Sequence, residues 1–493
     1  MIEQHLPVLV VVLPLIAAPL CVFLFNRALV YLFALAACWT TFGLSLFLLT
    51  KVLQTGPISY ELGNWPAPYG IEYVADYFST FVMSFVTGIG AVVLTYAPRS
   101  LSQEVDPSRH YLVYPMYLLC MSGLLGICIT GDLFNVFVFL EISSLSSYAL
   151  ISLGRSRRAP LAAFQYLVMG TIGATFLLIG IGLLYQLTGT LNMADMAAQL
   201  GDDHGSRTML VAFAFMTVGL CIKMAVFPLH TWLPNAYTYA PSVVTAFIAA
   251  TATKVSVYAF VRIVYSIFTP QFAFDVHGLD VFLTAFSLVG IFVASTAAIY
   301  QGNLKRLLAY SSIAQVGYML LGISMNNQDG LTSGIVHMFN HAVIKGGLFL
   351  VVGCFALRLS SVRLEDLRGA AKTMPWTSFA WVLGGLGLIG VPLTAGFVSK
   401  WLLLTAALDN ASYLVAGLML LSSLLAVVYV WRVVEILYFS EPSEAVKSSR
   451  EAPWSMLIPT YLLILGILVF GVWTSCSVGF ASQAAQALLG GSP

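Results

Sequence analysis

Charged residues are scarce in this sequence. Only 9% of its 493 residues are Asp, Glu, Lys or Arg, whereas 59% are hydrophobic. Soluble domains carry about a quarter charged residues, and so few polar groups could not cover the surface of a water-soluble globule. The mean hydropathy of +0.90 therefore indicates a protein embedded in a lipid bilayer. The formal net charge of +1 argues against a nucleic-acid partner, which would favour a basic chain.

The motifs that bind cofactors and metals are also missing. The sequence contains no P-loop, no H-E-x-x-H, no nucleophile elbow and no C-x-x-C. The segment GLGLIG at Gly385–Gly390 matches G-x-G-x-x-G, but it lies in an apolar run with no preceding strand, which favours close helix packing. The seven cysteines lie mostly in apolar runs, where we expect small buried residues. We expect neither a cofactor nor a bound metal.

Long apolar runs, in contrast, follow one another along the whole chain. A helix needs about 20 residues to cross a bilayer, and the connections between the runs are short. We predict an all-α, polytopic membrane protein with about fourteen transmembrane helices. The predicted spans are 7–24, 29–52, 77–97, 110–130, 132–153, 161–188, 208–228, 241–267, 278–300, 304–323, 331–357, 377–404, 411–438 and 453–482.

The basic residues are distributed unevenly between the two sides of the predicted membrane. Most of them lie in the loops after spans 1, 3, 5, 9, 11 and 13, and few lie on the opposite side. The positive-inside rule then places these loops in the cytoplasm and both termini on the outer side of a cell (inner) membrane. The basic loops hold Arg27; Arg99 and Arg109; Arg155, Arg157 and Arg158; Lys305 and Arg306; Arg358, Arg363, Arg368 and Lys372; and Arg432, Lys447 and Arg450. The opposite side holds Lys51, Arg207 and Arg262, with the acids Glu61, Glu72, Asp195, Asp202, Asp203 and Asp275.

Four lysines and one acid remain inside the apolar spans: Lys223, Lys254, Lys345, Lys400 and Glu141. A charge at the bilayer centre costs about 2.5–3.5 kcal/mol even on the mildest scale, which packing alone does not justify. Two alternatives stay open. Lysines near a helix end, such as Lys223 and Lys400, could snorkel to the interface, and Glu141 could be a protonated, hydrogen-bonded carboxyl. We favour a Glu–Lys pair that exchanges protons.

Glu141 lies in the segment GDLFNVFVFLEISSLSSYAL. Asp132 precedes it by nine residues, which is about 13 Å along a helix. Asp132 should therefore lie near the membrane edge and Glu141 near the middle. The hydroxyl groups of four serines that follow could hold water beside Glu141. These serines are Ser143, Ser144, Ser146 and Ser147.

Span 11 carries His337, His341 and Lys345 at positions i, i+4 and i+8. They share one helix face over about 12 Å, and imidazoles relay protons through two nitrogens. We therefore predict a proton wire along this face. Two alternatives are open. The histidines could be hydrogen-bonded core residues, or the pair could bind a metal, although no carboxylate or cysteine lies with it.

Two predicted spans contain helix-breaking residues. Span 7 continues into Pro228, Pro234 and Pro241, and span 12 has Pro392 and Gly396 beside its lysine. Proline breaks the helical ladder, and broken backbone at membrane depth lines a cavity or is buried in protein. Such helices in corresponding halves indicate inverted repeats. We predict four parts: helices 1–3 (1–109), a first repeat of helices 4–8 (110–267), a second repeat of helices 9–13 (278–438) and a C-terminal helix (453–493).

Five segments of the sequence resemble the proton-translocating antiporter-like family. They are GDLFNVFVFLEISSLSSYAL, FPLHTWLPNAYTYAPSVVTAFIAATATKVSVYAF, LKRLLAYSSIAQVGYMLLG, HMFNHAVIKGGLFL and VPLTAGFVSKWLLL. The family includes antiporter-like subunits of respiratory complex I, Mrp cation/proton antiporters and membrane-bound hydrogenases. NVFVFLEISSLSSYAL and A-Y-x-x-A-P-S are most similar to the D subunit of Mrp antiporters, whereas complex I subunits usually have A-H-x-x-A-P-T, with a histidine in place of Tyr237.

The resemblance implies roles for the buried polar residues. Glu141 matches the glutamate of the fifth helix, Lys223 its paired lysine on the seventh, Lys254 the bridging lysine on the eighth and Lys400 the charged residue on the twelfth. The central hydrophilic axis on the eleventh helix corresponds to His337, His341 and Lys345.

The resemblance also implies a function. The chain is expected to be the proton-translocating subunit of a multisubunit Mrp-type monovalent cation (Na⁺)/H⁺ antiporter, a transporter component and not an enzyme. Its expected partners are the other subunits, protons, a monovalent cation and the lipid bilayer. The alternative is a proton-pumping subunit of a redox complex, either NADH-quinone oxidoreductase or membrane-bound hydrogenase. A structural scaffold is the third alternative, which leaves the buried charges unexplained.

Overall fold

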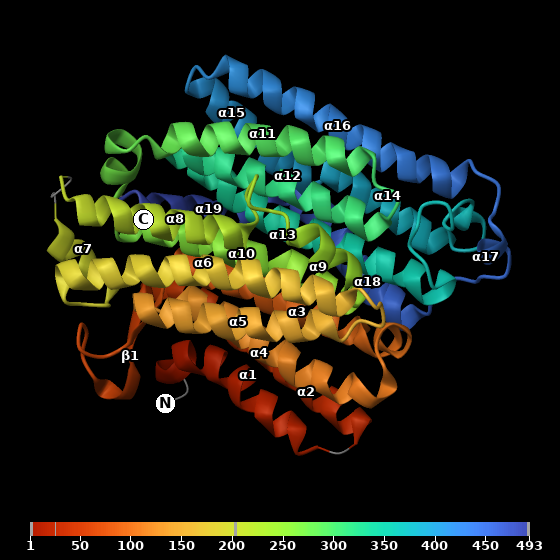
Figure 1. Cartoon of the computed structure of the whole chain (residues 1–493), viewed down its shortest axis with the longest axis horizontal. Helices are drawn as coiled ribbons and strands as arrows, with labels where there is room; N and C mark the ends of the chain where they lie inside the picture. The colour runs from red at the N-terminus through yellow and green to blue at the C-terminus, as the bar shows by residue number, and fades with distance from the viewer. Residues whose placement is uncertain (1–2, 25, 202–204, 491–493) are drawn as a thin grey trace.

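The computed structural model describes residues 3–24, 26–201 and 205–490; Asp202 and Asp203 lie outside them. Its helices lie side by side along the long axis of the molecule (Figure 1). Among the described residues, 13 helices are long and apolar enough to cross a membrane. The chain is a mainly helical, polytopic membrane protein, as predicted.

The described residues form nineteen α-helices, one two-stranded hairpin and five short 3₁₀- or π-helical segments. The helices are α1 (Leu6–Val22), α2 (Arg27–Thr55), α3 (Tyr77–Glu104), α4 (His110–Ile129), α5 (Leu133–Ser152), α6 (Ala159–Thr188), α7 (Met193–Leu200), α8 (Arg207–Met224), α9 (Leu233–Tyr239), α10 (Ser242–Ser266), α11 (Leu279–Ile299), α12 (Leu304–Ser324), α13 (Gln328–Leu359), α14 (Pro375–Ile389), α15 (Ala395–Asp409), α16 (Tyr413–Tyr438), α17 (Glu444–Lys447), α18 (Trp454–Val472) and α19 (Thr474–Leu488). The antiparallel strands are β1 (Ile58–Glu61) and β2 (Glu72–Ala75), with Ile58 opposite Ala75.

The predicted broken helices are confirmed. Span 7 is divided into α8 and α9, and span 12 into α14 and α15. Pro228 and Pro392 lie in the two gaps. A proline ring collides with the carbonyl four residues earlier, and α8 ends at Met224, four residues before Pro228. Span 12 thus consists of two helices of 15 residues each, and each alone is too short to cross a bilayer.

Polar side chains cap three of the helices that carry charged residues of the interior, α5, α12 and α13. The Asp132 carboxylate accepts a hydrogen bond from the backbone N–H of Asn135, at 2.7 Å, and begins α5. Asn303 caps α12 and Asn327 caps α13 in the same way. Such caps satisfy N–H groups that a helix leaves without partners. They fix where each helix starts, and therefore which residues reach mid-membrane depth.

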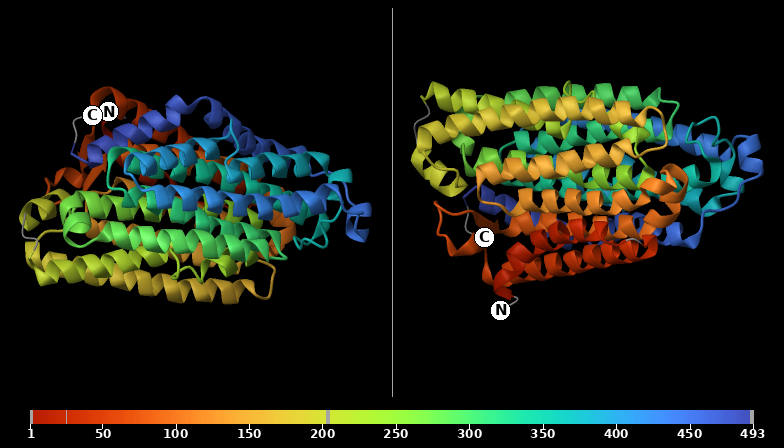
Figure 2. Two further views of the ribbon diagram at one scale, coloured as in Figure 1. Left: turned by 90° about the horizontal axis from the view of Figure 1, so that it is seen from above. Right: turned by 60° about the horizontal axis from the view of Figure 1, so that its bottom comes forward.

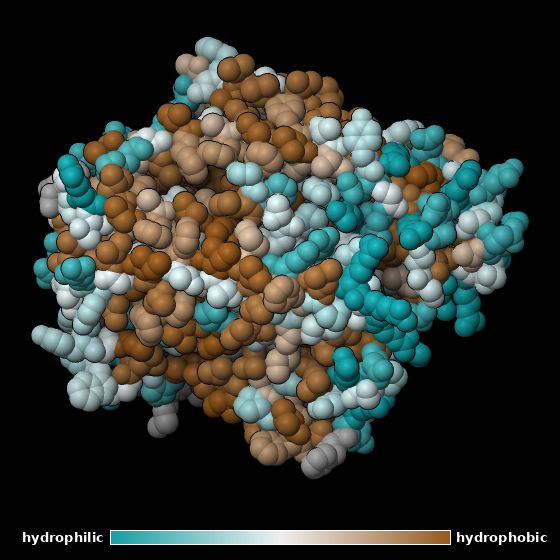
Figure 3. Space-filling view, viewed as in Figure 1, coloured by the Kyte–Doolittle hydropathy of each residue, from teal (hydrophilic) through white to brown (hydrophobic). Residues whose placement is uncertain are grey.

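Helix α13 occupies the centre of the bundle. It packs against α3, α10, α12, α14, α15, α18 and α19, and nearly all its side chains are buried. Outer helices such as α2, α6, α11 and α16 present apolar side chains on the surface, and Figure 3 shows a broad apolar face. The polar residues of α10, α12 and α13 are therefore enclosed by protein.

The two ends of the bundle differ. Both described ends of the chain lie at the same end of the bundle, together with the β1–β2 hairpin and α7 (Figures 1 and 2). Hydrophilic side chains gather near α17 at the opposite end (Figure 3). The sequence did not predict the hairpin or α7. Both are short, and each lies in a connection between two spans, the hairpin between α2 and α3 and α7 between α6 and α8.

Candidate functional site

Glu141 and Lys223 meet between α5 and α8. Glu141 lies near the middle of α5, and Lys223 is in the last turn of α8, one residue before the helix breaks. The Lys223 Nζ lies 3.5 Å from Glu141 Oε1, with side chains that are 4% and 25% exposed. The predicted proximity is confirmed, and Lys223 does not snorkel.

The four serines that follow Glu141 have different hydrogen-bond partners. Only Ser144 faces the pair, and its hydroxyl accepts a hydrogen bond of 2.9 Å from Lys223 Nζ. Ser143, Ser146 and Ser147 donate to backbone carbonyls one turn earlier in α5. These three hydroxyls donate to their own helix, as serines within helices often do, and their oxygens remain acceptors.

Lys254 and Lys345 lie deep in the protein interior. Lys254, halfway along α10, donates to the carbonyl of Ala249 and to the hydroxyl of Thr253 at 3.3 Å. Lys345 donates to the carbonyl of Leu308 at 2.8 Å and to the hydroxyl of Ser311 on α12. Both lysines are fully buried. Among the described residues, neither has an acidic partner within 4.0 Å.

The two histidines of α13 have different surroundings. His337 Nδ1 lies 2.9 Å from the hydroxyl of Ser399, and its Nε2 lies 2.9 Å from Gln315 Oε1. His341 is buried, and neither ring nitrogen has a hydrogen-bond partner in the described part of the chain. The rings are nearly parallel, with centroids 6.2 Å apart. His337 is thus hydrogen-bonded on both sides, whereas His341 has no such bond among the described residues.

Lys400 lies in the second turn of α15, and its side chain reaches back to the break between α14 and α15. Its Nζ donates to the carbonyl of Ile389 at 2.8 Å, at the C-terminal end of α14, where the helix dipole is negative. The Nζ also lies 4.9 Å from the ring centroid of Tyr318 and 3.4 Å from the hydroxyl of Ser423. Its preceding residue, Ser399, contacts His337. The α13 stripe therefore ends beside Lys400.

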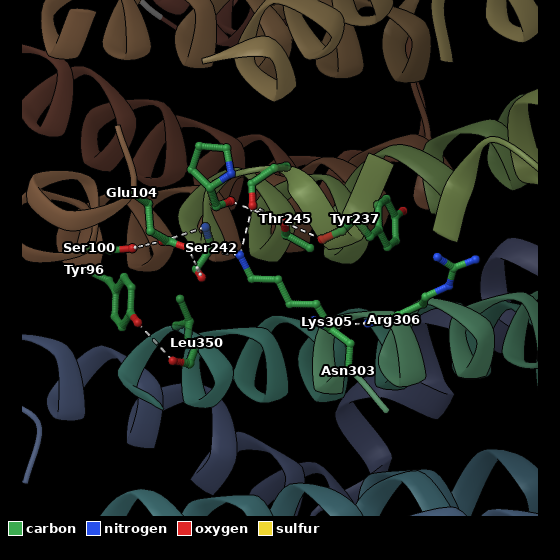
Figure 4. Close-up of polar contacts among 12 residues, drawn as sticks. Tyr96, Ser100, Glu104, Tyr237, Ser242, Thr245, Asn303, Lys305, Arg306 and Leu350 are labelled. Atoms are coloured by element: carbon green, nitrogen blue, oxygen red, sulfur yellow. Dashed lines mark hydrogen bonds and ion pairs between the residues drawn. The ribbon is translucent and has the colours of Figure 1, made fainter. Parts of the chain in front are cut away.

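A second ionic cluster was missed by the sequence analysis. Glu104, at the end of α3, forms a 3.0 Å ion pair with Lys305, which was expected in an exposed basic loop but is buried in the first turn of α12. Glu104 also accepts hydrogen bonds from the backbone N–H and the hydroxyl of Ser242, both at 2.8 Å, and from Ser100 at 2.9 Å. Lys305 donates to the carbonyl of Ala240 (Figure 4). The cluster joins α3, α10 and α12.

This cluster lies at the base of a cavity of about 420 Å³. The cavity is lined by Arg155, Tyr239, Glu104 and Lys305, among others. It opens between the α5–α6 connection, the start of α10 and the end of α13. It therefore reaches from the basic end of the bundle to the start of α10, the helix that carries Lys254.

Arg262 and Asp76 form a corresponding ion pair at the other end of α10. Their side chains approach to 2.7 Å, and Arg262 also contacts the hydroxyl of Tyr258. Asp76 caps α3 at the same time, through the backbone N–H of Ser79. Neither pair was predicted, because the partners are far apart in the sequence and each residue alone resembles an ordinary loop residue.

A helical membrane protein with a row of enclosed lysines and histidines, one of them paired with a carboxylate, is typical of proton-translocating proteins. Residues 130–426 match the family described as NADH:quinone oxidoreductase/Mrp antiporter, transmembrane. The chain belongs to this family.

Relatives carry both of the names that the family covers. The chain is 41% identical to the N subunit of NADH-quinone oxidoreductase of Desulforudis audaxviator, over 95% of this chain and 96% of the relative. It is 31% identical to the D subunit of the Na(+)/H(+) antiporter of Alkalihalophilus pseudofirmus, over 90% of this chain and 89% of the relative. A chain in the structure of the Mrp complex from a Dietzia species superposes with a TM-score of 0.91 and is 25% identical. The superposition covers 99% of this chain and 98% of that chain.

These comparisons confirm the resemblance, the fold class and the classification as a membrane transporter subunit. The similarity to a component of the Mrp complex supports the expectation that the chain works with other subunits.

Proposed function

We propose that this chain is the proton-translocating subunit of an Mrp-type monovalent cation (Na⁺)/H⁺ antiporter. The observation that carries the proposal is the Glu141–Lys223 pair, 3.5 Å apart between α5 and α8. Beyond this pair lies a row of enclosed basic side chains that ends at Lys400. A carboxylate and an amine in contact can exchange a proton. The relatives named as D subunits of Na(+)/H(+) antiporters support this function.

The proton path in this proposal has two halves. Protons pass Glu141, Lys223 and Lys254 in the first half. They then cross along α13 through Lys345, His341 and His337, and leave near Lys400. The ring contact of 5.6 Å between Tyr318 and His337, together with the Ser399 bond, supports the last step.

The two halves correspond, in this proposal, to two inverted repeats. Residues 110–267 form the first and residues 278–438 the second, with 1–109 and 453–493 outside them. Supporting this, both broken helices carry a lysine at the break, Lys223 in α8 and Lys400 in α15. The end with many basic residues is the cytoplasmic side, so both termini lie on the outer side of the cell (inner) membrane.

The first test is the variant Glu141→Gln in the assembled complex. Everted vesicles are given a pH gradient, and its dissipation by added Na⁺ is followed with a fluorescent dye. We expect the variant to assemble normally and to lose antiport, because the carboxamide keeps the shape but cannot bind or release a proton. Antiport at the wild-type rate would refute the proton role of Glu141.

The second candidate function is proton pumping in a redox complex. The 41% identical relative, named as the N subunit of NADH-quinone oxidoreductase, favours it. The same vesicles separate the two. Na⁺-dependent dissipation of the pH gradient without an electron donor supports the antiporter. Proton uptake that requires both an electron donor and a quinone, in a complex that co-purifies with redox subunits, supports the alternative.

A further inference from the structure

The proposed path has a gap in its first half. Lys223 contacts Glu141 and Ser144, and Lys254 contacts Ala249 and Thr253. No hydrogen bond or ion pair in the described structure joins the two lysines. A proton that moves between them needs other groups that can both accept and donate.

Three buried tyrosines from three helices lie in this gap. Tyr148 is one turn after Ser144 on α5, and Ser144 is its polar neighbour. Its ring contacts that of Tyr166 on α6, with centroids 4.6 Å apart. Tyr166 also stacks on Trp232, the residue before α9, and α6 packs against α9, which carries Tyr237. The three tyrosines thus lie on neighbouring helices.

The last member of the group reaches the neighbourhood of Lys254. Tyr237 is buried, and the polar neighbour of its hydroxyl is Thr253. The Thr253 hydroxyl accepts the hydrogen bond from Lys254 Nζ. The ring of Tyr237 packs edge-on against Phe349 of α13, with centroids 5.9 Å apart. Tyr237 therefore stands between the first half and the central helix.

Two of these hydroxyls have unmet hydrogen-bonding capacity. Tyr148 and Tyr237 have no hydrogen-bond partner among the described residues, although both hydroxyls are buried. Buried polar groups are nearly always bonded to protein or to water, because leaving one unbonded is costly. Water between the tyrosines would satisfy both hydroxyls and would connect them.

The surrounding helices hold these tyrosines in place. The ring of Trp232, in the gap between α8 and α9, stacks on Tyr166 with centroids 3.8 Å apart. Its indole N–H donates to the carbonyl of Ile222, beside Lys223. On α6, a side chain at Gly170 would collide with the Tyr148 hydroxyl. The break in span 7 thus serves to position the aromatic group.

We propose that Tyr148, Tyr166 and Tyr237, with intervening water, carry protons between Lys223 and Lys254. Each hydroxyl accepts a proton on its oxygen from one neighbour and releases its own proton to the next, so no net charge stays on a tyrosine. Thr253 completes the link to Lys254. This inference rests on the proposed function and adds the residues that join its first two steps.

The test compares Tyr237→Phe and Tyr148→Phe with a matched control, Tyr117→Phe, in the assembled antiporter. Tyr117 is also a buried tyrosine in a membrane helix, but its hydroxyl donates to the carbonyl of Gly90, away from the link. We expect both link variants to slow proton transport in everted vesicles at least about tenfold, which corresponds to a barrier raised by about 1.4 kcal/mol. The control should stay within about twofold of the wild type.

A further variant separates a relay from a packing role. Tyr237→His returns a group that accepts and donates protons but has a different shape, so it should restore most of the transport lost in Tyr237→Phe. Assembly of each variant is followed by co-purification of the other subunits. Equal loss in the His and Phe variants, both assembled, would show that Tyr237 only packs.

The outcomes also separate this inference from the proposed function. If Glu141→Gln abolishes antiport while Tyr237→Phe and Tyr148→Phe transport normally, the tyrosine link is wrong and the antiporter function stands. If Glu141→Gln transports normally, the proposed function itself fails. Should Tyr237→Phe not assemble, Tyr148→Phe alone decides, and a normal rate in that variant overturns the link.

Discussion

The Glu104–Lys305 pair gives the sharpest stability prediction. Glu104 accepts three hydrogen bonds, two from Ser242 and one from Ser100, and its carboxylate lies 3.0 Å from Lys305 Nζ. At an effective dielectric constant of about 20, two charges at this distance attract by about 5 kcal/mol before desolvation is subtracted. Removing one partner of such a buried pair costs about 3–5 kcal/mol, because the other charge stays buried without compensation.

We therefore expect Glu104→Ala to lower the free energy of unfolding by about 3–5 kcal/mol. Glu104→Gln should lose less, because its amide oxygen still accepts from the backbone N–H of Ser242. The double variant Glu104→Ala with Lys305→Met should recover a large part of the loss, because neither charge remains. The measurement is reversible unfolding of the purified full chain in mixed micelles.

Two results would refute this stabilising role of the Glu104–Lys305 pair. If Glu104→Ala unfolds within about 1 kcal/mol of the wild type, the pair does not hold α3, α10 and α12 together. If the losses of the two single variants simply add in the double variant, the residues are not energetically coupled, and the argument from their contact fails.

Two more predictions concern the other polar contacts. Lys400→Ala should abolish Na⁺-dependent antiport in everted vesicles without affecting assembly, since the second half then has no amine at its broken helix; normal transport would disprove the relay through two halves. Asp76→Ala should destabilise the chain more than Arg262→Leu does, by about 0.5–2 kcal/mol, because Asp76 caps α3 as well as pairing with Arg262. Equal unfolding free energies of these two variants would contradict the capping role.

Local features of the site could be predicted from the sequence. Charged residues cannot face lipid, so Glu141 and Lys223, the one acid and a lysine of similar depth, were expected to meet, and they do. Spacing along one helix placed His337, His341 and Lys345 on one face, and the structure buries all three. Hydropathy, depth and helical period are properties of short segments, and they were sufficient for these predictions.

Contacts between distant segments could not be predicted in the same way. Glu104 and Lys305 are 201 positions apart, and Arg262 and Asp76 are 186 apart. Each of these residues lies near a helix end, where an exposed charge is ordinary. Only the packing of α3 against α10, and of α10 against α12, brings the partners together, and no periodic pattern encodes that packing.

The sequence also located the helix breaks only approximately. The prolines predicted that spans 7 and 12 would break. The residues that leave the helical conformation with a positive φ are, however, not the prolines themselves. Ala225 adopts a φ of +59° directly after α8, and Leu393 a φ of +73° before α15. Neither residue type favours the left-handed region. Tertiary contacts therefore override local preference there, as the Lys400 bond to the end of α14 illustrates.

The different environments of Lys223 and Lys400 make the proposed path asymmetric. Lys223 is paired with a carboxylate that can itself be protonated, so the first half can hold a proton on either of two groups. Lys400 is held by the carbonyl end of α14, by Ser423 and by the ring of Tyr318, and none of these takes up a proton at neutral pH. A proton in the second half therefore rests on the lysine or moves on to His337. Under the proposed function, Lys400 can release or receive a proton, but no neighbouring carboxylate can hold a second one. Proton uptake must therefore be controlled at Glu141.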